Sequence, residues 1–318
     1  MTDMRYRRLG ESGLAVSVVG IGCNNFAGRI SAAKAEEVVH TALDLGITLF
    51  DTADVYGEAP GASEQALGAA LGKRRDEAIV ATKFGMDVRG SYGPDWGARG
   101  SRRYVTRAVE ASLRRLGTDY IDLYQLHTPD PLTPIEETLH ALADLISAGK
   151  IRYIGHSNFA GWQIADAAWT ARSRNLTPFV SAQNRYSLLE REAEREVIPA
   201  CQRFGVGLLP YFPLTHGLLT GKYRRGETPP VGSRLDRVGF ARVLAEAPWD
   251  KIERLEEFAR VRGRTLLDIA IGGLGAQPAV ASVIAGATSA EQVRANATAV
   301  TWDPRPEDLD EINEITRV

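Results

Sequence analysis

The segment Ile47-Thr48-Leu49-Phe50-Asp51 is an apolar run that ends in a carboxylate, and Tyr56 follows five residues later. Two comparable runs come next along the chain, 78–82 before Lys83 and 121–126 before His127. Short apolar runs of this kind are typical of buried strands. If these strands lie parallel and in order, their polar ends converge on one rim of a sheet. We therefore expect an acid/base site formed by Asp51, Tyr56, Lys83 and His127.

Strand-like and helix-like segments alternate along most of the chain. The predicted barrel strands are 18–22, 47–51, 78–83, 121–127, 151–156, 179–184, 206–211 and 280–285. The predicted helices are one between a cap at Ser31 and a stop at Gly46, then 63–71 with Ser63 as its cap, 101–116, 134–148, 160–173, 192–204, 250–262, 265–275, 289–298 and 305–316. Eight successive strand–helix units predict an α/β fold, a (β/α)8 TIM barrel with extra C-terminal helices.

The remaining segments add detail to this barrel. Residues 5–9 and 14–19 flank turn-forming residues and predict an N-terminal β-hairpin. The long loops 85–100 and 213–247 are expected to border the site. A doubly wound sheet is the alternative fold, but its Gly-x-Gly-x-x-Gly turn is matched only by 20–25, which lacks the third glycine. No composition break divides the chain, so 1–318 is predicted to be a single domain.

Composition narrows the class of protein. The chain has 318 residues, a net charge of −2, 44% apolar residues and 25% charged residues, which is typical of a soluble globular protein. The near-neutral charge gives no reason to expect a nucleic-acid partner. No apolar run is long enough to cross a membrane and no signal segment is visible, so we expect a cytoplasmic protein.

Cysteine and histidine usage gives further expectations. Cys23 and Cys201 are the only cysteines, and a structural disulfide between them is not expected. Neither has a second cysteine at metal-binding spacing, and the five histidines form no known zinc pattern. A catalytic metal is therefore not expected.

The four polar side chains suggest a division of roles. A free tyrosine has a pKa near 10 and is a poor proton donor at neutral pH. We expect the Lys83 ammonium to lower the pKa of Tyr56, and Asp51 to keep Lys83 charged. His127 would hydrogen-bond the oxygen that Tyr56 protonates. Such a site suits protonation of a carbonyl oxygen while the carbonyl carbon is attacked. A Schiff base on Lys83, as in a lyase or isomerase, is an alternative.

Several long motifs, in order, resemble the aldo-keto reductase family. They are 46–57 (GITLFDTADVYG), 63–68, 81–84 (ATKF), 123–127 (LYQLH) and 149–159 (GKIRYIGHSNF), so the similarity runs almost end to end. The resemblance implies reduction of a small aldehyde or ketone by hydride from NADPH, with no metal. It also implies that Asp51, Tyr56, Lys83 and His127 are the catalytic tetrad, with Tyr56 as the general acid. A catalytically weak NADP(H)-binding regulatory subunit of the same fold is the alternative.

The resemblance also implies a set of cofactor-binding residues. Ser157, Asn158 and Gln183 match ligands of the nicotinamide carboxamide, and Tyr211 matches the residue that stacks on the nicotinamide ring. The other matching positions, for the pyrophosphate, the 2′-phosphate and the adenosine, are Gly22, Cys23, Asn24, Phe212, Pro213, Leu214, Gly217, Leu219, Gly221, Lys222, Arg234, Gly286, Thr288, Gln292 and Asn296.

Some positions depart from the family pattern. Phe212 stands where many relatives have Ser, Thr288 where several have Arg, and Ala295 where many have Glu. NADP(H) binding is therefore expected, but NADH use is also possible. Candidates for an apolar substrate pocket are Phe26, Trp96, Phe159 and Phe212. The sequence predicts neither the physiological substrate nor the oligomeric state.

Overall fold

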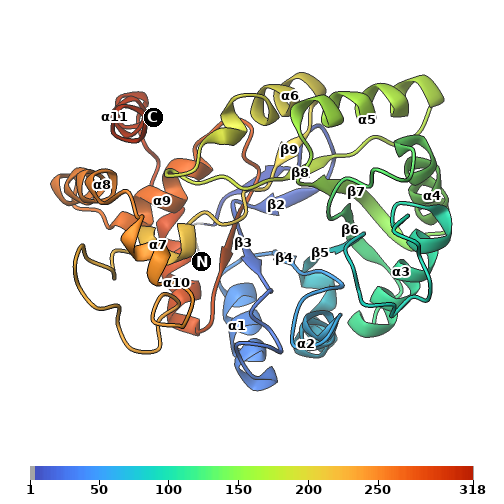
Figure 1. Ribbon diagram of the computed structural model, residues 1–318, viewed down its shortest axis with the longest axis horizontal. Coiled ribbons are helices and arrows are strands. Elements are labelled where there is room, and N and C mark those ends of the chain that lie inside the picture. Colours follow the sequence, from blue (N-terminus) through green and yellow to red (C-terminus); the bar gives the residue numbers. More distant parts are fainter. Residues whose placement is uncertain (1–3, 318) are drawn as a thin grey trace.

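The computed structural model describes residues 4–317, and its centre is an eight-stranded parallel sheet (Figure 1). The strands run in the spatial order β10, β3, β4, β5, β6, β7, β8, β9. A bridge between Leu208 and Val280 joins β9 to the chain just before β10. The two edge strands of the curled sheet, β9 and β10, therefore lie next to each other. Helices surround the sheet, which confirms the predicted (β/α)8 barrel. The strands are β3 (Val19–Gly22), β4 (Leu49–Asp51), β5 (Ile79–Phe84), β6 (Ile121–Leu126), β7 (Ile151–Ser157), β8 (Ser181–Gln183), β9 (Gly207–Leu208) and β10 (Val283–Gly286).

Most helices begin and end within two residues of their predicted limits. They are α1 (Ala32–Asp44), α2 (Ala62–Leu71), α3 (Arg102–Leu116), α4 (Ile135–Ser147), α5 (Gly161–Arg174), α6 (Val197–Phe204), α7 (Ala241–Ala245), α8 (Trp249–Val261), α9 (Leu266–Gly275), α10 (Ala290–Ala299) and α11 (Pro306–Thr316). Ser31 caps α1 as predicted, since its hydroxyl accepts a hydrogen bond from the backbone N–H of Lys34.

Three local predictions were wrong. Ser63 is not a helix cap, because Gly61 is the N-cap residue of α2 and the Ser63 hydroxyl instead donates to the carbonyl of Cys23. The predicted helix 192–204 is divided into a 3₁₀ turn, η2 (Glu192–Glu194), and α6. The strand predicted at 206–211 is shorter, since Pro210 has no N–H to continue the ladder.

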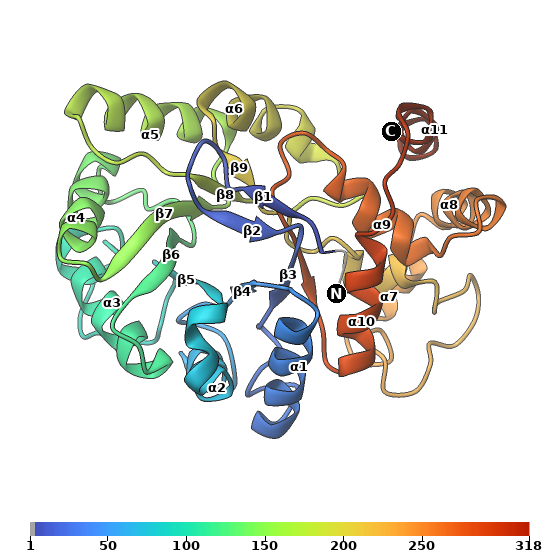
Figure 2. The ribbon, with the colours of Figure 1, turned by 180° about the vertical axis from the view of Figure 1, so that it is seen from behind.

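An antiparallel hairpin, β1 (Tyr6–Arg8) and β2 (Ala15–Ser17), confirms the predicted N-terminal hairpin. Figure 2 shows it lying across one end of the barrel. The backbone N–H of Glu11, in its turn, donates to the carbonyl of Gly205, which lies just before β9. The hairpin therefore covers the amino-terminal ends of the strands and leaves the carboxyl ends for the site.

The interior of the barrel changes from apolar to polar along the strands. An apolar layer beside the hairpin contains Leu9, Val16, Leu49, Ala81, Leu123, Leu209, Ala281 and Ile284. Alternate residues of a strand face the same side. Asp51 and Lys83 follow Leu49 and Ala81 of this layer by two residues, so their side chains also point into the barrel. This alternation places the polar side chains at the carboxyl ends of strands that are otherwise apolar.

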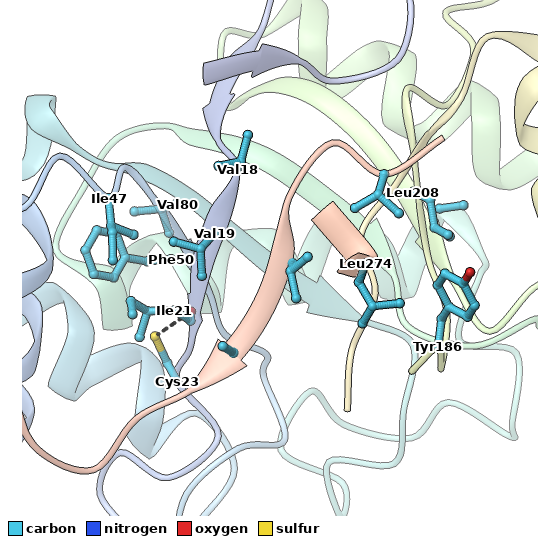
Figure 3. Close-up of a cluster of buried hydrophobic side chains, with 14 of the residues drawn as sticks. Val18, Val19, Ile21, Cys23, Ile47, Phe50, Val80, Tyr186, Leu208 and Leu274 are labelled. Atoms are coloured by element: carbon cyan, nitrogen blue, oxygen red, sulfur yellow. Dashed lines mark hydrogen bonds between the residues drawn. The ribbon is translucent and has the colours of Figure 1, made fainter. Parts of the chain in front are cut away.

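A second, larger core fills the space between the sheet and the helices. Figure 3 shows part of it, in which Ile21 lies beside Cys23, and Ile47, Phe50 and Val80 lie together. Both cysteines are buried and free. Within residues 4–317, no helix is long and apolar enough to cross a membrane.

The two predicted long loops are present at the carboxyl ends of the strands. Residues 85–100 form turns without regular structure. The segment 213–247 is less irregular than predicted, because it contains a 3₁₀ element, η3 (Thr215–Thr220), and the short helix α7.

Candidate active site

The ammonium group of Lys83 is the centre of the site and is fully buried at the end of β5. Its Nζ donates to Asp51 Oδ2 at 2.6 Å, to the carbonyl of Thr52 at 2.9 Å and to the Tyr56 hydroxyl at 3.5 Å. An ammonium has three hydrogens, so all three are engaged. Burial lowers the pKa of Lys83, but the charge of Asp51 and the contact with Tyr56 more than offset this and raise it. The amine therefore stays charged, which argues against a Schiff base at this position.

Asp51 is held on its other side by two amides. Its Oδ1 accepts a hydrogen bond from Gln183 Nε2 at 2.8 Å and a longer one from Gln125 Nε2 at 3.4 Å. These donors come from β8 and β6, whose side chains reach Asp51 across the barrel interior. The carboxylate is thus surrounded by donors, which fixes its orientation toward Lys83.

Tyr56 lies on the loop after β4, and its hydroxyl faces the pocket from beside Lys83. Burial raises the pKa of Tyr56 and outweighs the lowering that Lys83 exerts. The expectation that the ammonium brings the pKa of Tyr56 below its usual value is therefore wrong. Burial of a phenol was not visible in the sequence, and it is the largest influence here.

His127 follows β6, and its ring meets the Tyr56 ring edge-on, with centroids 5.7 Å apart. Burial, with a smaller contribution from Lys83, lowers the pKa of His127 to about 3. The imidazole is therefore neutral at physiological pH and has one N–H to donate. The four side chains predicted from strand ends thus lie together at one rim of the barrel.

A cavity of ≈ 490 Å³ opens above these four side chains. Asp51, Tyr56 and His127 line it, together with most of the positions expected to bind a cofactor: Gly22, Asn24, Ser157, Asn158, Gln183, Tyr211, Phe212, Pro213, Leu214, Gly217, Lys222, Arg234, Gly286, Thr288, Gln292 and Asn296. Cys23, Leu219 and Gly221 do not line it. The Cys23 side chain points into the core beside Ile21 (Figure 3), so it offers no contact to the cavity.

Among the four aromatic residues proposed for an apolar pocket, only Phe212 lines the cavity. Phe26 and Phe159 are buried in the core behind it. Trp96 is 76% exposed on the loop 85–100. The prediction for these three was wrong, because position in the chain does not decide whether an aromatic side chain faces the core, the solvent or the cavity.

Other cavity residues were not predicted: Asn25, Arg29, Met86, Thr215, His216, Thr220, Leu267 and Ile284. Met86 could have been found, since it follows β5 by two residues and so lies at the rim. Arg29 belongs to a turn with no motif, and nothing in the sequence marks it.

The part of the cavity next to Tyr56 is rich in oriented amides. Asn158 has a left-handed backbone (φ 62°), and its Nδ2 donates to the carbonyl of His127 at 2.9 Å. The Tyr211 hydroxyl donates to Asn158 Oδ1 at 2.8 Å, which leaves the Tyr211 ring along the cavity. Amide and hydroxyl groups with fixed orientations, next to an aromatic ring, therefore line this part of the cavity.

The other part of the cavity is positively charged. Burial lowers the pKa of Arg234, and the neighbouring cations of Arg29 and Arg237 lower it further. The guanidinium of Arg234 stacks over Phe212, 5.1 Å from the ring centroid. A bound anion would offset the electrostatic repulsion among these cations.

The far end of the cavity is formed by the start of α10. Ser289 caps this helix by accepting a hydrogen bond from the backbone N–H of Gln292. Asn296 lines the cavity, and its buried Nδ2 has no hydrogen-bond partner in the described residues. A buried amide without a partner is costly, so a ligand with an acceptor atom fits here. Within residues 4–317 there is no group of three or more His, Cys, Asp and Glu side chains that could hold a metal ion.

A buried Lys83–Asp51 ion pair in contact with the Tyr56 hydroxyl, beside a partly cationic cavity at the rim of a barrel, is suited to acid/base catalysis on a bound ligand. The sequence matches the Aldo/keto reductase family over residues 18–317, and the chain belongs to this family. It is 35% identical to the L-glyceraldehyde 3-phosphate reductase of Escherichia coli (strain K12), over 94% of this chain and 88% of the relative. It is 34% identical to the uncharacterized oxidoreductase YrpG of Bacillus subtilis (strain 168), over 98% and 96%. It is also 35% identical to a probable voltage-gated potassium channel subunit beta of Arabidopsis thaliana, over 98% and 96%.

Proposed function

We propose that the protein reduces the carbonyl group of a small aldehyde or ketone to an alcohol, with NADPH as the hydride donor. The observation that carries this proposal is the contact of the Tyr56 hydroxyl, which lines the cavity, with a fully buried, charged Lys83. Family membership supports an oxidoreductase, and the family generally uses nicotinamide cofactors.

The roles of the residues follow from their charges. NADPH, when bound, supplies the hydride that attacks the carbonyl carbon. Tyr56 gives its proton to the carbonyl oxygen, and the raised pKa keeps that proton in place until charge develops on the oxygen. Lys83 then stabilises the phenolate that remains, and neutral His127 donates a hydrogen bond to the same substrate oxygen. Tyr56 regains a proton from solvent after each cycle.

The residues of the cavity fit a dinucleotide phosphate along its whole length. Asn158, Gln183 and Tyr211 would hold the nicotinamide, and Asn296 and Gln292 the adenosine. Lys222 and Arg234 would pair with the 2′-phosphate through charge-assisted hydrogen bonds. We also propose that the protein works in the cytoplasm, where its two free, buried cysteines would stay reduced.

The role of Arg234 can be tested by its replacement with alanine. Arg234→Ala is expected to weaken NADPH binding about tenfold or more, because it removes a charge-assisted contact, and to weaken NADH binding much less. Fluorescence titration of both cofactors measures this. Arg224→Ala is the matched control, since Arg224 belongs to the same segment but pairs with Glu256. Equal losses for NADPH and NADH would contradict the role in 2′-phosphate binding.

A regulatory subunit with little turnover is the second candidate, because a relative at 35% identity is described as a potassium channel subunit beta. A panel of aldehydes separates the two candidates, with NADPH and NADH oxidation followed by absorbance. The panel includes 4-nitrobenzaldehyde as a reactive probe and L-glyceraldehyde 3-phosphate, the substrate named for the Escherichia coli relative. Turnover of at least one aldehyde is expected. Cofactor binding without turnover across the panel would favour the regulatory subunit.

A further inference from the structure

A buried polar network outside the cavity joins the loop after β4 to the loop after β5. Glu64 of α2 accepts hydrogen bonds from Thr82 Oγ1 at 2.6 Å and from Arg115 Nε at 2.6 Å. Arg115, on α3, also donates through Nη2 to the Tyr92 hydroxyl at 2.9 Å. That hydroxyl in turn donates to Asp54 Oδ2 at 3.2 Å. The chain of contacts therefore ends on Asp54, two residues before Tyr56.

The charges of this network do not balance if Asp54 is ionised. Glu64 and Asp54 are both fully buried, and Arg115 is the cation that pairs with Glu64 and acts most strongly on Asp54. Arg115 contacts Glu64 directly and reaches Asp54 only through the neutral phenol of Tyr92. Lys83 is already paired with Asp51. An isolated buried carboxylate is very costly, so such a group takes up a proton instead.

The surroundings of Asp54 agree with a neutral carboxylic acid. Burial and the charge of Glu64 raise the pKa of Asp54, whereas Arg115, Tyr92 and Lys83 lower it, and the net result is well above the ordinary value. Its Oδ1 has no hydrogen-bond partner among residues 4–317. A proton on the carboxyl group removes the unpaired charge, and the hydrogen bond from Tyr92 is kept.

The position of Asp54 connects this network with the site. Its backbone N–H donates to the carbonyl of Lys83, so it is fixed to the end of β5. Tyr92 belongs to the loop 85–100, whose residue Met86 lines the cavity that Tyr56 also lines. Tyr104 holds this loop at a second point by donating to the carbonyl of Met86 at 2.9 Å. The Asp54–Tyr92 bond thus links the loop that carries Tyr56 to the loop that carries Met86.

We propose that a protonated Asp54 and Tyr92 are positioning residues, whose hydrogen bond holds the Met86 wall of the substrate site at a fixed distance from the Tyr56 hydroxyl. The proposal rests on the proposed function, since it treats Tyr56 as the group that meets the substrate. In this proposal the loop 85–100 is a fixed wall of the substrate site.

Tyr92→Phe removes the hydroxyl and keeps the ring. We expect the KM for aldehydes to rise about fivefold, the usual effect of one lost hydrogen bond, while the affinity for NADPH stays unchanged. Tyr120→Phe is the matched control, because it removes a similar bond from Tyr120 to Asp76, 2.9 Å long, on the exposed surface. An unchanged KM in Tyr92→Phe would overturn the proposal. An equal rise of the KM in Tyr120→Phe would also overturn it.

Asp54→Asn tests the protonation state without any turnover, so its outcome is independent of the proposed reaction. An asparagine has one acceptor and one donor side, as a protonated carboxyl group does. At neutral pH the infrared spectrum of the wild type should contain the carbonyl band of a protonated carboxylic acid, and the variant should lack it. An identical pair of spectra in this region would overturn the proposal.

The stability of the same variant gives a second readout with a definite sign. Because the pKa of Asp54 is higher in the folded state, the folded protein binds more protons than the unfolded chain once the pH exceeds the ordinary aspartate value. The contribution of Asp54 to stability is full below that value and is lost as the pH rises toward the folded pKa. The denaturant midpoint of Asp54→Asn, relative to that of the wild type, should therefore rise as the pH rises. A constant difference from pH 5 to pH 9 would contradict a protonated Asp54.

Discussion

Tyr56→Phe should lower kcat for carbonyl reduction by about 10²–10⁴-fold, the range expected when a general acid is removed. Phenylalanine keeps the ring that packs edge-on against His127, so the cavity keeps its shape. Only the proton and the hydroxyl contact with Lys83 are lost. Cofactor affinity should stay nearly unchanged, because the contacts expected for NADPH come from other residues. Single-turnover kinetics and fluorescence titration measure the two quantities separately.

A control for this variant is available within the same chain. Tyr186 is also buried, and its hydroxyl donates to Glu194 at 2.7 Å, but it does not line the cavity. Tyr186→Phe should cost about 1 kcal/mol of stability and leave turnover unchanged. If Tyr56→Phe kept wild-type turnover, the proton would have to come from another group, and the proposed mechanism would be wrong.

The pH dependence of the wild type follows from the same geometry. Burial raises the pKa of Tyr56, so the phenol keeps its proton throughout the neutral range. The rate of reduction should therefore be flat near neutral pH and fall only above the ordinary tyrosine value of about 10. His127 adds no inflection there, because its pKa is lowered to about 3 and it is already neutral.

The sequence was sufficient to predict the barrel and the meeting of four polar side chains at its rim. Each of Asp51, Lys83 and His127 follows an apolar run, and a parallel barrel brings the ends of neighbouring strands together whatever the loops do. The meeting of these three side chains depends only on the topology of the barrel, and the alternation of strands and helices in the sequence predicts that topology.

Features that depend on side-chain direction across loops were not predicted. Trp96 and Phe159 were placed in the pocket because of their position in the chain, yet one is exposed and the other buried in the core. The direction of the Tyr56 pKa shift was wrong for a related reason, since it depends on how much water reaches the phenol. The bond between Asp54 and Tyr92 joins residues 38 apart that no periodic pattern relates.

Lys83→Met should have the largest effect on stability, because it leaves Asp51 buried without its cation. Breaking a buried ion pair by removing one partner costs about 3–5 kcal/mol. Gln183 and Gln125 would still donate to Asp51, but neutral amides do not replace a charge. Turnover should fall as well, by about 10²–10³-fold, because the phenolate of Tyr56 loses its stabilising ammonium. Denaturant unfolding and steady-state kinetics measure the two losses.

A second substitution separates these two consequences. In Asp51→Asn/Lys83→Met both charges are gone, so no unpaired carboxylate remains in the barrel, and about 2 kcal/mol of the lost stability should return. Turnover should not return, because nothing then stabilises the phenolate. If the double variant regained activity together with stability, the role of Lys83 would be to hold the fold. If stability returns alone, the ammonium acts on the proton that Tyr56 gives up, and the ion pair with Asp51 is the means by which a charged amine is kept in an apolar barrel.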